Sequence, residues 1–157
     1  MISQFEIYLT VENIYLWSNI GILPFWLLMI FIPNSKFTRV LINSIIAPLL
    51  IASAYVYVLY KAMLLDEEVL SIFSLYFDLE NLYTIFATES FLLIFWLHFM
   101  AINLFLGSWV AIDGAKYSIP KIFTAIILIL IYFTGPLGLI LYWFIRVFYS
   151  KKLGFHD

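Results

Sequence analysis

The sequence predicts an all-α integral membrane protein with four transmembrane helices and an interfacial helical connection between the second and third. Of its 157 residues, 65% are hydrophobic and 11% are charged, which is more apolar surface than a soluble domain of this size can bury. Four long apolar stretches follow one another along the chain. A segment too charged to cross a membrane and too apolar to be a solvated loop separates the middle two. We therefore expect one transmembrane domain over residues 1–157, with the lipid bilayer as its first partner.

Composition also excludes several kinds of site. The chain has no cysteine, so disulfides, thiolate metal sites and a cysteine nucleophile are absent. The formal net charge of -2 and the lack of a long basic run argue against nucleic acid as a partner. No metal site is expected, because the third apolar stretch offers no second ligand at a four-residue step from its histidine.

The first two spans are predicted over about residues 14–32 and 40–60. Pro33 and Asn34 end the first span in a short polar turn. Tyrosines near the end of the second span are typical of a membrane interface. These features favour two membrane helices joined by a tight turn.

The segment over about residues 66–88 is predicted to be an interfacial helical connection, broken near Asp78. Its acidic side chains are interspersed with apolar ones, a composition typical of a helix lying in the membrane surface. The acidic residues are Asp66, Glu67, Glu68, Asp78 and Glu80.

The third span, over about residues 90–112, is predicted to lie at the centre of the bundle. Glu89 and Asp113 enclose an uncharged stretch that reaches roughly 34 Å at about 1.5 Å per residue, enough to cross a core of about 30 Å. His98 and Asn103 lie near its middle, where lipid cannot satisfy a polar group. Stepping 100° per residue places Asn103 on the face of Glu89 and His98 on the opposite face. Polar groups on both sides favour a helix surrounded by protein.

The fourth span is predicted over about residues 122–145, interrupted near its midpoint by Gly135 and Pro136. Such a break is tolerated at that depth where it packs on protein or lines a cavity. With four spans, each membrane face carries the same number of Lys and Arg side chains, so the positive-inside rule does not predict which face of the protein is cytoplasmic. One membrane face is predicted to carry Lys36, Arg39, Lys116 and Lys121, and the other Lys61, Arg146, Lys151 and Lys152.

Two motifs carry a resemblance to a known family. The run WLHFMAINLFLGSWVAIDG followed by TGPLGLILYWFIR resembles the small four-helix membrane proteins related to the plant abscisic-acid-deficiency protein implicated in neoxanthin synthesis. The resemblance covers roughly residues 19–146. Asn103 stands where the family pattern has an acid, and Ser108 where it has an arginine. The matching residues of the third span are Trp96, His98, Leu104, Phe105, Gly107, Trp109 and Asp113.

The resemblance implies a carotenoid-linked role in a multi-pass membrane protein of a bacterial inner membrane, a photosynthetic membrane or an organelle membrane. Conversion of violaxanthin to neoxanthin is an isomerisation, which needs an acid at the epoxide and a base that removes a proton as the allene forms. No redox cofactor is required, and a bound carotenoid or other pigment is the expected apolar ligand.

His98 is the candidate acid–base residue, and the residues expected to shape a pigment pocket are Trp96, Asn103, Trp109, Asp113 and Pro136. For each, a structural role is the alternative: a hydrogen-bonded histidine, an asparagine that joins helices, a cap or a packing kink. The sequence leaves open whether the chain is an enzyme. A non-enzymatic subunit or assembly factor of a larger membrane complex is the second hypothesis, and an oligomeric carrier of small solutes the third.

Overall fold

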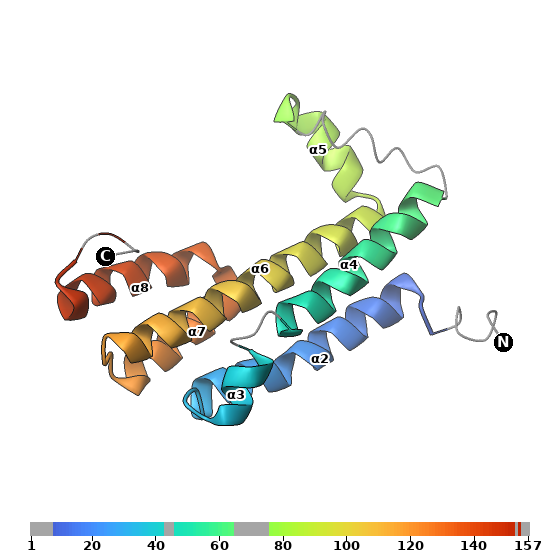
Figure 1. The fold of residues 1–157 in the computed structure, drawn as a ribbon. Helices are drawn as coiled ribbons and strands as arrows, with labels where there is room; N and C mark the ends of the chain where they lie inside the picture. Colours follow the sequence, from blue (N-terminus) through green and yellow to red (C-terminus); the bar gives the residue numbers. More distant parts are fainter. Residues whose placement is uncertain (1–7, 43–45, 65–75, 153, 155–157) are drawn as a thin grey trace. The chain divides into compact units, whose positions relative to one another are not determined.

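The structure, a computed structural model, describes residues 8–42, 46–64, 76–152 and 154, and every regular element within those ranges is a helix. Figure 1 labels these helices along the chain. In chain order they are α2 (Val11–Phe31), α3 (Lys36–Leu41), α4 (Ile46–Leu64), α5 (Leu79–Phe86), α6 (Glu89–Lys116), α7 (Lys121–Thr134) and α8 (Pro136–Ser150).

The chain divides into two compact units. Unit 1 comprises residues 1–20 and 50–99, and unit 2 comprises residues 21–49 and 100–157. The division passes through α2, α4 and α6, so each unit takes part of these helices. The two units are described separately below.

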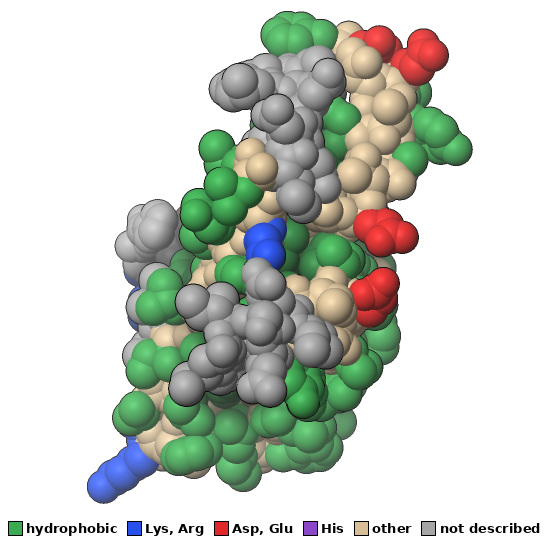
Figure 2. Space-filling model, turned by 90° about the vertical axis from the view of Figure 1, so that its right-hand side faces the viewer, with side chains coloured by type: hydrophobic (Ala, Val, Ile, Leu, Met, Phe, Trp, Pro, Cys, Tyr) green, Lys and Arg blue, Asp and Glu red, His purple; other side chains and the backbone are tan. Residues whose placement is uncertain are grey.

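In the described part of the chain, three stretches are long and apolar enough to cross a membrane: α2, the stretch Lys36–Leu64 that contains α3 and α4, and α6. Within its most apolar window, α6 is 44% buried, compared with 28% for α2 and 20% for the second stretch. The remaining apolar helices, α7 and α8, are shorter. Hydrophobic side chains are spread over much of the described surface visible in Figure 2.

In unit 1, α5 begins directly after Asp78. The Asp78 side chain accepts a hydrogen bond of 3.1 Å from the backbone N–H of Glu80 and caps the helix. No residue of α5 is buried, and its apolar side chains lie on one side of the helix, which suits a membrane surface. Residues 65–75, which belong to the predicted interfacial connection, lie outside the described residues.

In unit 2, buried aliphatic side chains of α6 and α7 form the core. The largest fully buried ones are Leu104 and Val110 of α6 and Ile127, Leu128 and Ile131 of α7. The Ser108 hydroxyl of α6 donates a 3.0 Å hydrogen bond to the Ile42 carbonyl, which follows α3. This bond gives a partner to the carbonyl of a buried residue at a helix end.

The stretch predicted as one interrupted fourth span is divided in the structure into α7 and α8, which pack along each other (Figure 1). Gly135 adopts a φ of 58°, a conformation that favours glycine, and Pro136 has no N–H with which to continue α7. A Cβ added to Gly138 would lie 2.7 Å from the backbone nitrogen of Ile131, so the two helices meet almost backbone to backbone. The break is therefore a reversal of the chain.

The reversal also corrects the expected position of Arg146. The sequence places Arg146 and Lys116 on opposite membrane faces, because it treats residues 122–145 as a single crossing. In the structure the Arg146 side chain bonds to Asp113, in the last turn of α6, and to Tyr117, which directly follows Lys116 at the end of that helix. Because α7 and α8 have 14 and 15 residues and fold back on each other, the end of α8 lies near the C-terminal end of α6.

Candidate functional site

Unit 1 contains a groove of about 430 Å³ between the first turns of α2 and the first turns of α6. Apolar and aromatic side chains form its walls. Two exposed carboxylates, Glu12 and Glu89, belong to the same lining. The complete lining is Val11, Glu12, Tyr15, Glu89, Leu92, Leu93 and Trp96.

Trp96 is held in a defined orientation within this groove. Its indole Nε1 donates a 3.3 Å hydrogen bond to Oδ1 of Asn19. The Asn19 amide nitrogen in turn donates to the Tyr15 carbonyl at 2.7 Å, which fixes the asparagine on α2. The Trp96 ring stacks on Phe99, with 5.6 Å between centroids, and lies 6.2 Å from the Tyr15 ring. The aromatic wall is therefore formed before any ligand arrives.

His98 is not part of the groove lining, although it is only two residues from Trp96. Two residues correspond to about 200° around an α-helix, so the two side chains leave α6 in nearly opposite directions. The imidazole is exposed and lies beside α4, with 6.3 Å between its centroid and that of Tyr55. The structure does not bring the predicted acid–base residue and the predicted Trp96 wall into one cavity.

Unit 2 contains a buried polar cluster around Asp113. The Asp113 Oδ2 atom accepts hydrogen bonds from the Tyr142 hydroxyl and from Nε of Arg146, both at 2.6 Å. Arg146 is fully buried and also donates to the Gly154 carbonyl at 2.8 Å and to the Tyr117 hydroxyl at 3.3 Å. Its guanidinium carbon lies 4.7 Å from the Tyr117 ring centroid. Each charged group thus has a charged or polar partner, as burial requires.

Trp109 and Asp113 are brought together through Tyr142. The Trp109 ring meets the Tyr142 ring edge to face, with 5.4 Å between centroids, while the Tyr142 hydroxyl holds Asp113. Tyr142 is itself fully buried. These contacts join α6 to α8, so the predicted pocket residues Trp109 and Asp113 take part in helix packing.

Asn103 packs against the turn between α7 and α8, beside the predicted residue Pro136. A Cβ added to Gly135 would lie 2.5 Å from Oδ1 of Asn103, so any larger residue here would displace the amide. Asn103 is 5% exposed, and its Nδ2 has no hydrogen-bond partner among the described residues. The indole nitrogen of Trp26 is a second buried donor of this kind. Its ring lies edge to face against Tyr132, with 5.4 Å between centroids.

Sequence reasoning missed the partners that make these sites. Glu12 and Glu89 each lie at the start of an apolar stretch, so the sequence predicts helix-end roles for them. The structure shows that both line one groove between α2 and α6. The sequence predicts Arg146 at the end of a span, and it lies next to Asp113 because the chain reverses between α7 and α8. Within the described ranges, no group of three or more His, Cys, Asp and Glu side chains is placed to hold a metal ion.

Comparison with known proteins identifies the family. No curated protein and no solved structure shows significant similarity to the chain. The sequence profile of the ABA DEFICIENT 4-like family, however, matches residues 13–142, which includes both apolar motifs quoted above except for the last residues of the second. The match spans most of the chain, from the first turn of α2 into α8. This protein therefore belongs to the ABA DEFICIENT 4-like family.

Proposed function

We propose that this protein is a carotenoid-associated membrane protein that binds the oxygenated end ring of a xanthophyll in the unit 1 groove. Membership of the family, which implies a carotenoid-related association, is the observation that carries the proposal. The groove is a part of unit 1 whose apolar walls and carboxylates match such a ligand.

The lining of the groove supports this assignment. A xanthophyll has an apolar polyene and end rings that carry hydroxyl or epoxide oxygens. Leu92, Leu93 and Trp96 offer apolar contact to the ring, and the carboxylates of Glu12 and Glu89 can accept hydrogen bonds from a hydroxyl. A volume of about 430 Å³ is near the lower end of ordinary ligand pockets, so the groove suits one end ring while the polyene extends along lipid-facing surface.

The catalytic form of the proposal is the isomerisation of a xanthophyll epoxide to an allene. An acid delivers a proton to the epoxide oxygen as its C–O bond breaks, and a base removes a proton from the adjacent chain carbon as the second double bond of the allene forms. One proton is gained and one is lost, so no net oxidation or reduction occurs. His98 is the candidate that the sequence favours for this proton transfer. Glu12 and Glu89 are supported by their place in the groove beside Trp96.

Pigment binding by the purified protein tests the proposal. The protein would be incubated in mild detergent with violaxanthin or with β-carotene, which lacks oxygen, and the co-eluting pigment quantified from its three-banded absorption. We expect Trp96→Ala to reduce violaxanthin binding about tenfold, since loss of a buried aromatic contact in a ligand site removes 1–2 kcal/mol or more. Trp17→Ala is the matched control, because Trp17 lies on the same helix as Tyr15, is 62% exposed and does not line the groove.

The carboxylates give the proposal its selectivity. We expect Glu12→Gln together with Glu89→Gln to weaken violaxanthin binding while leaving β-carotene binding unchanged, because only the xanthophyll presents a hydroxyl to them. Equal retention of both pigments by Trp96→Ala and Trp17→Ala would remove the groove from consideration. A colourless protein under all these conditions would contradict the pigment-binding proposal as a whole.

Catalysis is tested separately by following neoxanthin formation from violaxanthin by chromatography. If His98 is the acid–base residue, His98→Ala abolishes conversion while pigment binding is retained. If the groove carboxylates act instead, Glu12→Gln or Glu89→Gln abolishes conversion and His98→Ala leaves it intact. Binding without conversion by the unaltered protein would make it a carrier of the pigment and not an isomerase.

A non-enzymatic subunit or assembly factor is the second candidate function, favoured by the contacts of Asn103 and Ser108. These residues stand where the resemblance expects an acid and an arginine, and neither carries a charge. Ser108 bonds to the Ile42 carbonyl, and Asn103 packs against Gly135, so both positions serve helix packing. Co-purification of stoichiometric membrane partners in mild detergent would support this function, whereas a lone monodisperse species would count against it.

A further inference from the structure

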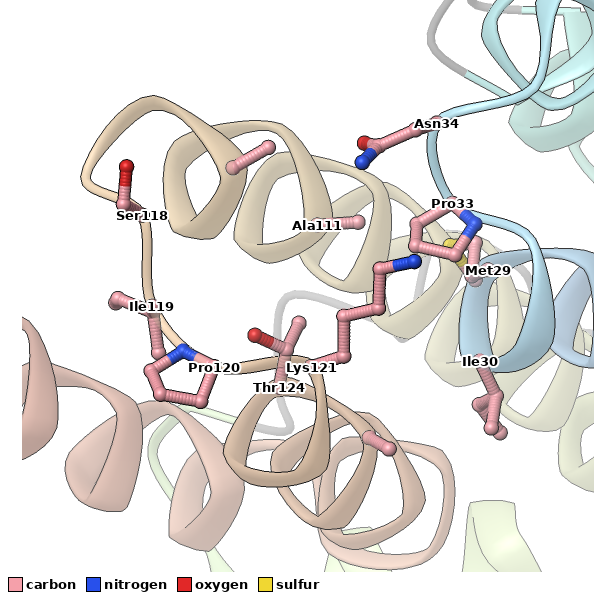
Figure 3. A pocket seen from close by; sticks show the side chains of 12 residues that line it. Met29, Ile30, Pro33, Asn34, Ala111, Ser118, Ile119, Pro120, Lys121 and Thr124 are labelled. Atoms are coloured by element: carbon pink, nitrogen blue, oxygen red, sulfur yellow. The ribbon is translucent and has the colours of Figure 1, made fainter.

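We propose that unit 2 contains a second site, separate from the groove, that binds a phosphate group, supplied either by an anionic phospholipid headgroup or by free phosphate. The site is a pocket of about 320 Å³. Its walls come from the turn after α2, the C-terminal end of α6 and the first turn of α7 (Figure 3). All of these segments belong to unit 2.

Lys121 supplies the positive charge of this pocket. It is the first residue of α7, and in Figure 3 its ammonium group extends across the pocket toward Pro33 and Asn34. Among the described residues of unit 2 the one carboxylate is that of Asp113, which is already bonded to Tyr142 and Arg146. No acidic side chain of unit 2 that the structure describes is thus left to neutralise Lys121.

Thr124 supplies a hydroxyl to the wall of the same pocket. Its side chain lines the pocket one turn after Lys121 and extends from α7 toward α6 (Figure 3). The residue is 8% exposed, yet its hydroxyl makes no hydrogen bond to any residue that the structure describes. A hydroxyl that lines a pocket and has no partner on the protein is available to a ligand bound there. A phosphate oxygen is a suitable acceptor.

The start of α7 adds backbone donors to the same place. Pro120 precedes the helix and makes no side-chain hydrogen bond to it, so the first N–H groups of α7 lack a side-chain cap. The partial positive charge at a helix N-terminus favours an anion in this position. Asn34 and Ser118 contribute further polar side chains to the lining.

The distribution of charge between the units makes an anion the natural ligand of unit 2. Unit 1 has one cationic side chain, Lys61, among many acids, whereas the acids of unit 2 are Asp113 and Asp157 alone. The cations of unit 2 include those that the sequence predicts on one membrane face, where lipid phosphates are found. These are Lys36, Arg39, Lys116 and Lys121.

Binding of three probes to the purified protein in neutral detergent tests the site: short-chain phosphatidylglycerol, the diacylglycerol with the same chains, and inorganic phosphate. We expect saturable binding of phosphatidylglycerol that Lys121→Gln weakens about tenfold and Thr124→Val about threefold, because each variant removes one hydrogen bond to the phosphate and the lysine bond is charge-assisted. Lys116→Gln is the matched control, since Lys116 is the exposed last residue of α6 and does not line the pocket. Helical content and monodispersity of each variant verify that it has folded.

Comparison of the probes distinguishes the two sources of phosphate. Competition by inorganic phosphate assigns the site to free phosphate chemistry, and binding of phosphatidylglycerol alone assigns it to a lipid headgroup. Either result supports the proposal. Equal binding of the diacylglycerol, equal loss in Lys116→Gln and Lys121→Gln, or no binding of either phosphate probe would overturn it.

Discussion

Arg146 is the residue whose environment most strongly constrains the fold. A guanidinium with no solvent exposure is tolerated because Asp113 neutralises it and because the Tyr117 hydroxyl and the Gly154 carbonyl accept two further hydrogen bonds from it. The desolvation of such a pair costs about as much as its attraction returns, so the pair gives specificity to the α6–α8 contact more than net stability. Removing one partner lowers the stability strongly, because the other charge is then buried without a counter-charge.

Arg146→Met is therefore expected to lower the free energy of unfolding by about 3–5 kcal/mol, the usual cost of breaking a buried ion pair from one side. Denaturation of the detergent-solubilised protein, followed by helical circular dichroism, measures the change. Arg39→Met is the control, because Arg39 is exposed and its side chain donates one 3.2 Å hydrogen bond to the Asn34 carbonyl. Similar small losses in both variants would show that Arg146 is not buried as described.

Tyr142 offers a finer test of the same cluster. Its hydroxyl donates a 2.6 Å hydrogen bond to the Asp113 carboxylate, and its ring packs on Trp109. Tyr142→Phe keeps the ring and removes the donor, so we expect a loss of about 1.5–3 kcal/mol, the range for a hydrogen bond to a charged group. Tyr149→Phe, at an exposed position of α8, should leave the unfolding free energy within about 0.5 kcal/mol of the parent. A loss confined to Tyr149→Phe would contradict the cluster.

At the scale of elements, the turn between α7 and α8 depends on Gly135 and Gly138, which have different structural roles. Gly135 supplies the positive φ at which the chain reverses and leaves space for the Asn103 amide. Gly138 allows α8 to approach the Ile131 backbone of α7. Backbone atoms cannot move aside as a side chain can, so the second requirement is the stricter one.

Gly138→Ala is expected to destabilise the protein by about 1–3 kcal/mol, because the added methyl group would overlap the Ile131 backbone. Gly21→Ala is a matched control within α2. A Cβ at Gly21 meets no atom within 4 Å, so alanine should be neutral or stabilising by about 0.5–1 kcal/mol through its better helix propensity. Thermal unfolding of the two variants side by side gives the comparison. A stable Gly138→Ala protein would mean that α7 and α8 do not pack as closely as described.

The elements most accessible to prediction were those with uniform composition. The long apolar runs of α2 and α6 lie close to their predicted bounds, because helix length and hydropathy are properties of the local sequence. The break at Gly135 was also visible in the sequence. The direction of the chain after Gly135 was not, since the same Gly-Pro pair serves a kinked helix and a reversal equally well. Only the contact of Gly138 with Ile131 distinguishes the two.

Across the whole molecule, the sequence identified individual polar residues of the apolar helices but not the residues with which they interact. His98, Asn103 and Asp113 stood out because each is a polar residue in an apolar helix. Their partners depend on how helices from distant parts of the chain meet, as Asp113 and Arg146 illustrate. The sequence also did not reveal that most acids lie in unit 1 and most cations in unit 2. The charged residues can be read from the sequence, but their assignment to a unit depends on contacts between distant segments.

The number of membrane crossings is the prediction that belongs to the whole chain. With 14 and 15 residues, α7 and α8 extend about 21 and 22 Å, short of a hydrocarbon core of about 30 Å, and Arg146 bonds to the C-terminal end of α6. We therefore expect cysteines placed at Lys116 and Lys152 to react with an impermeant maleimide from the same side of sealed vesicles. The parent has no cysteine to give a background, and Glu89→Cys, at the other end of the long helix α6, should react from the opposite side. Labelling of Lys116→Cys and Lys152→Cys from opposite sides would instead restore the four-span arrangement, with residues 122–145 as one crossing.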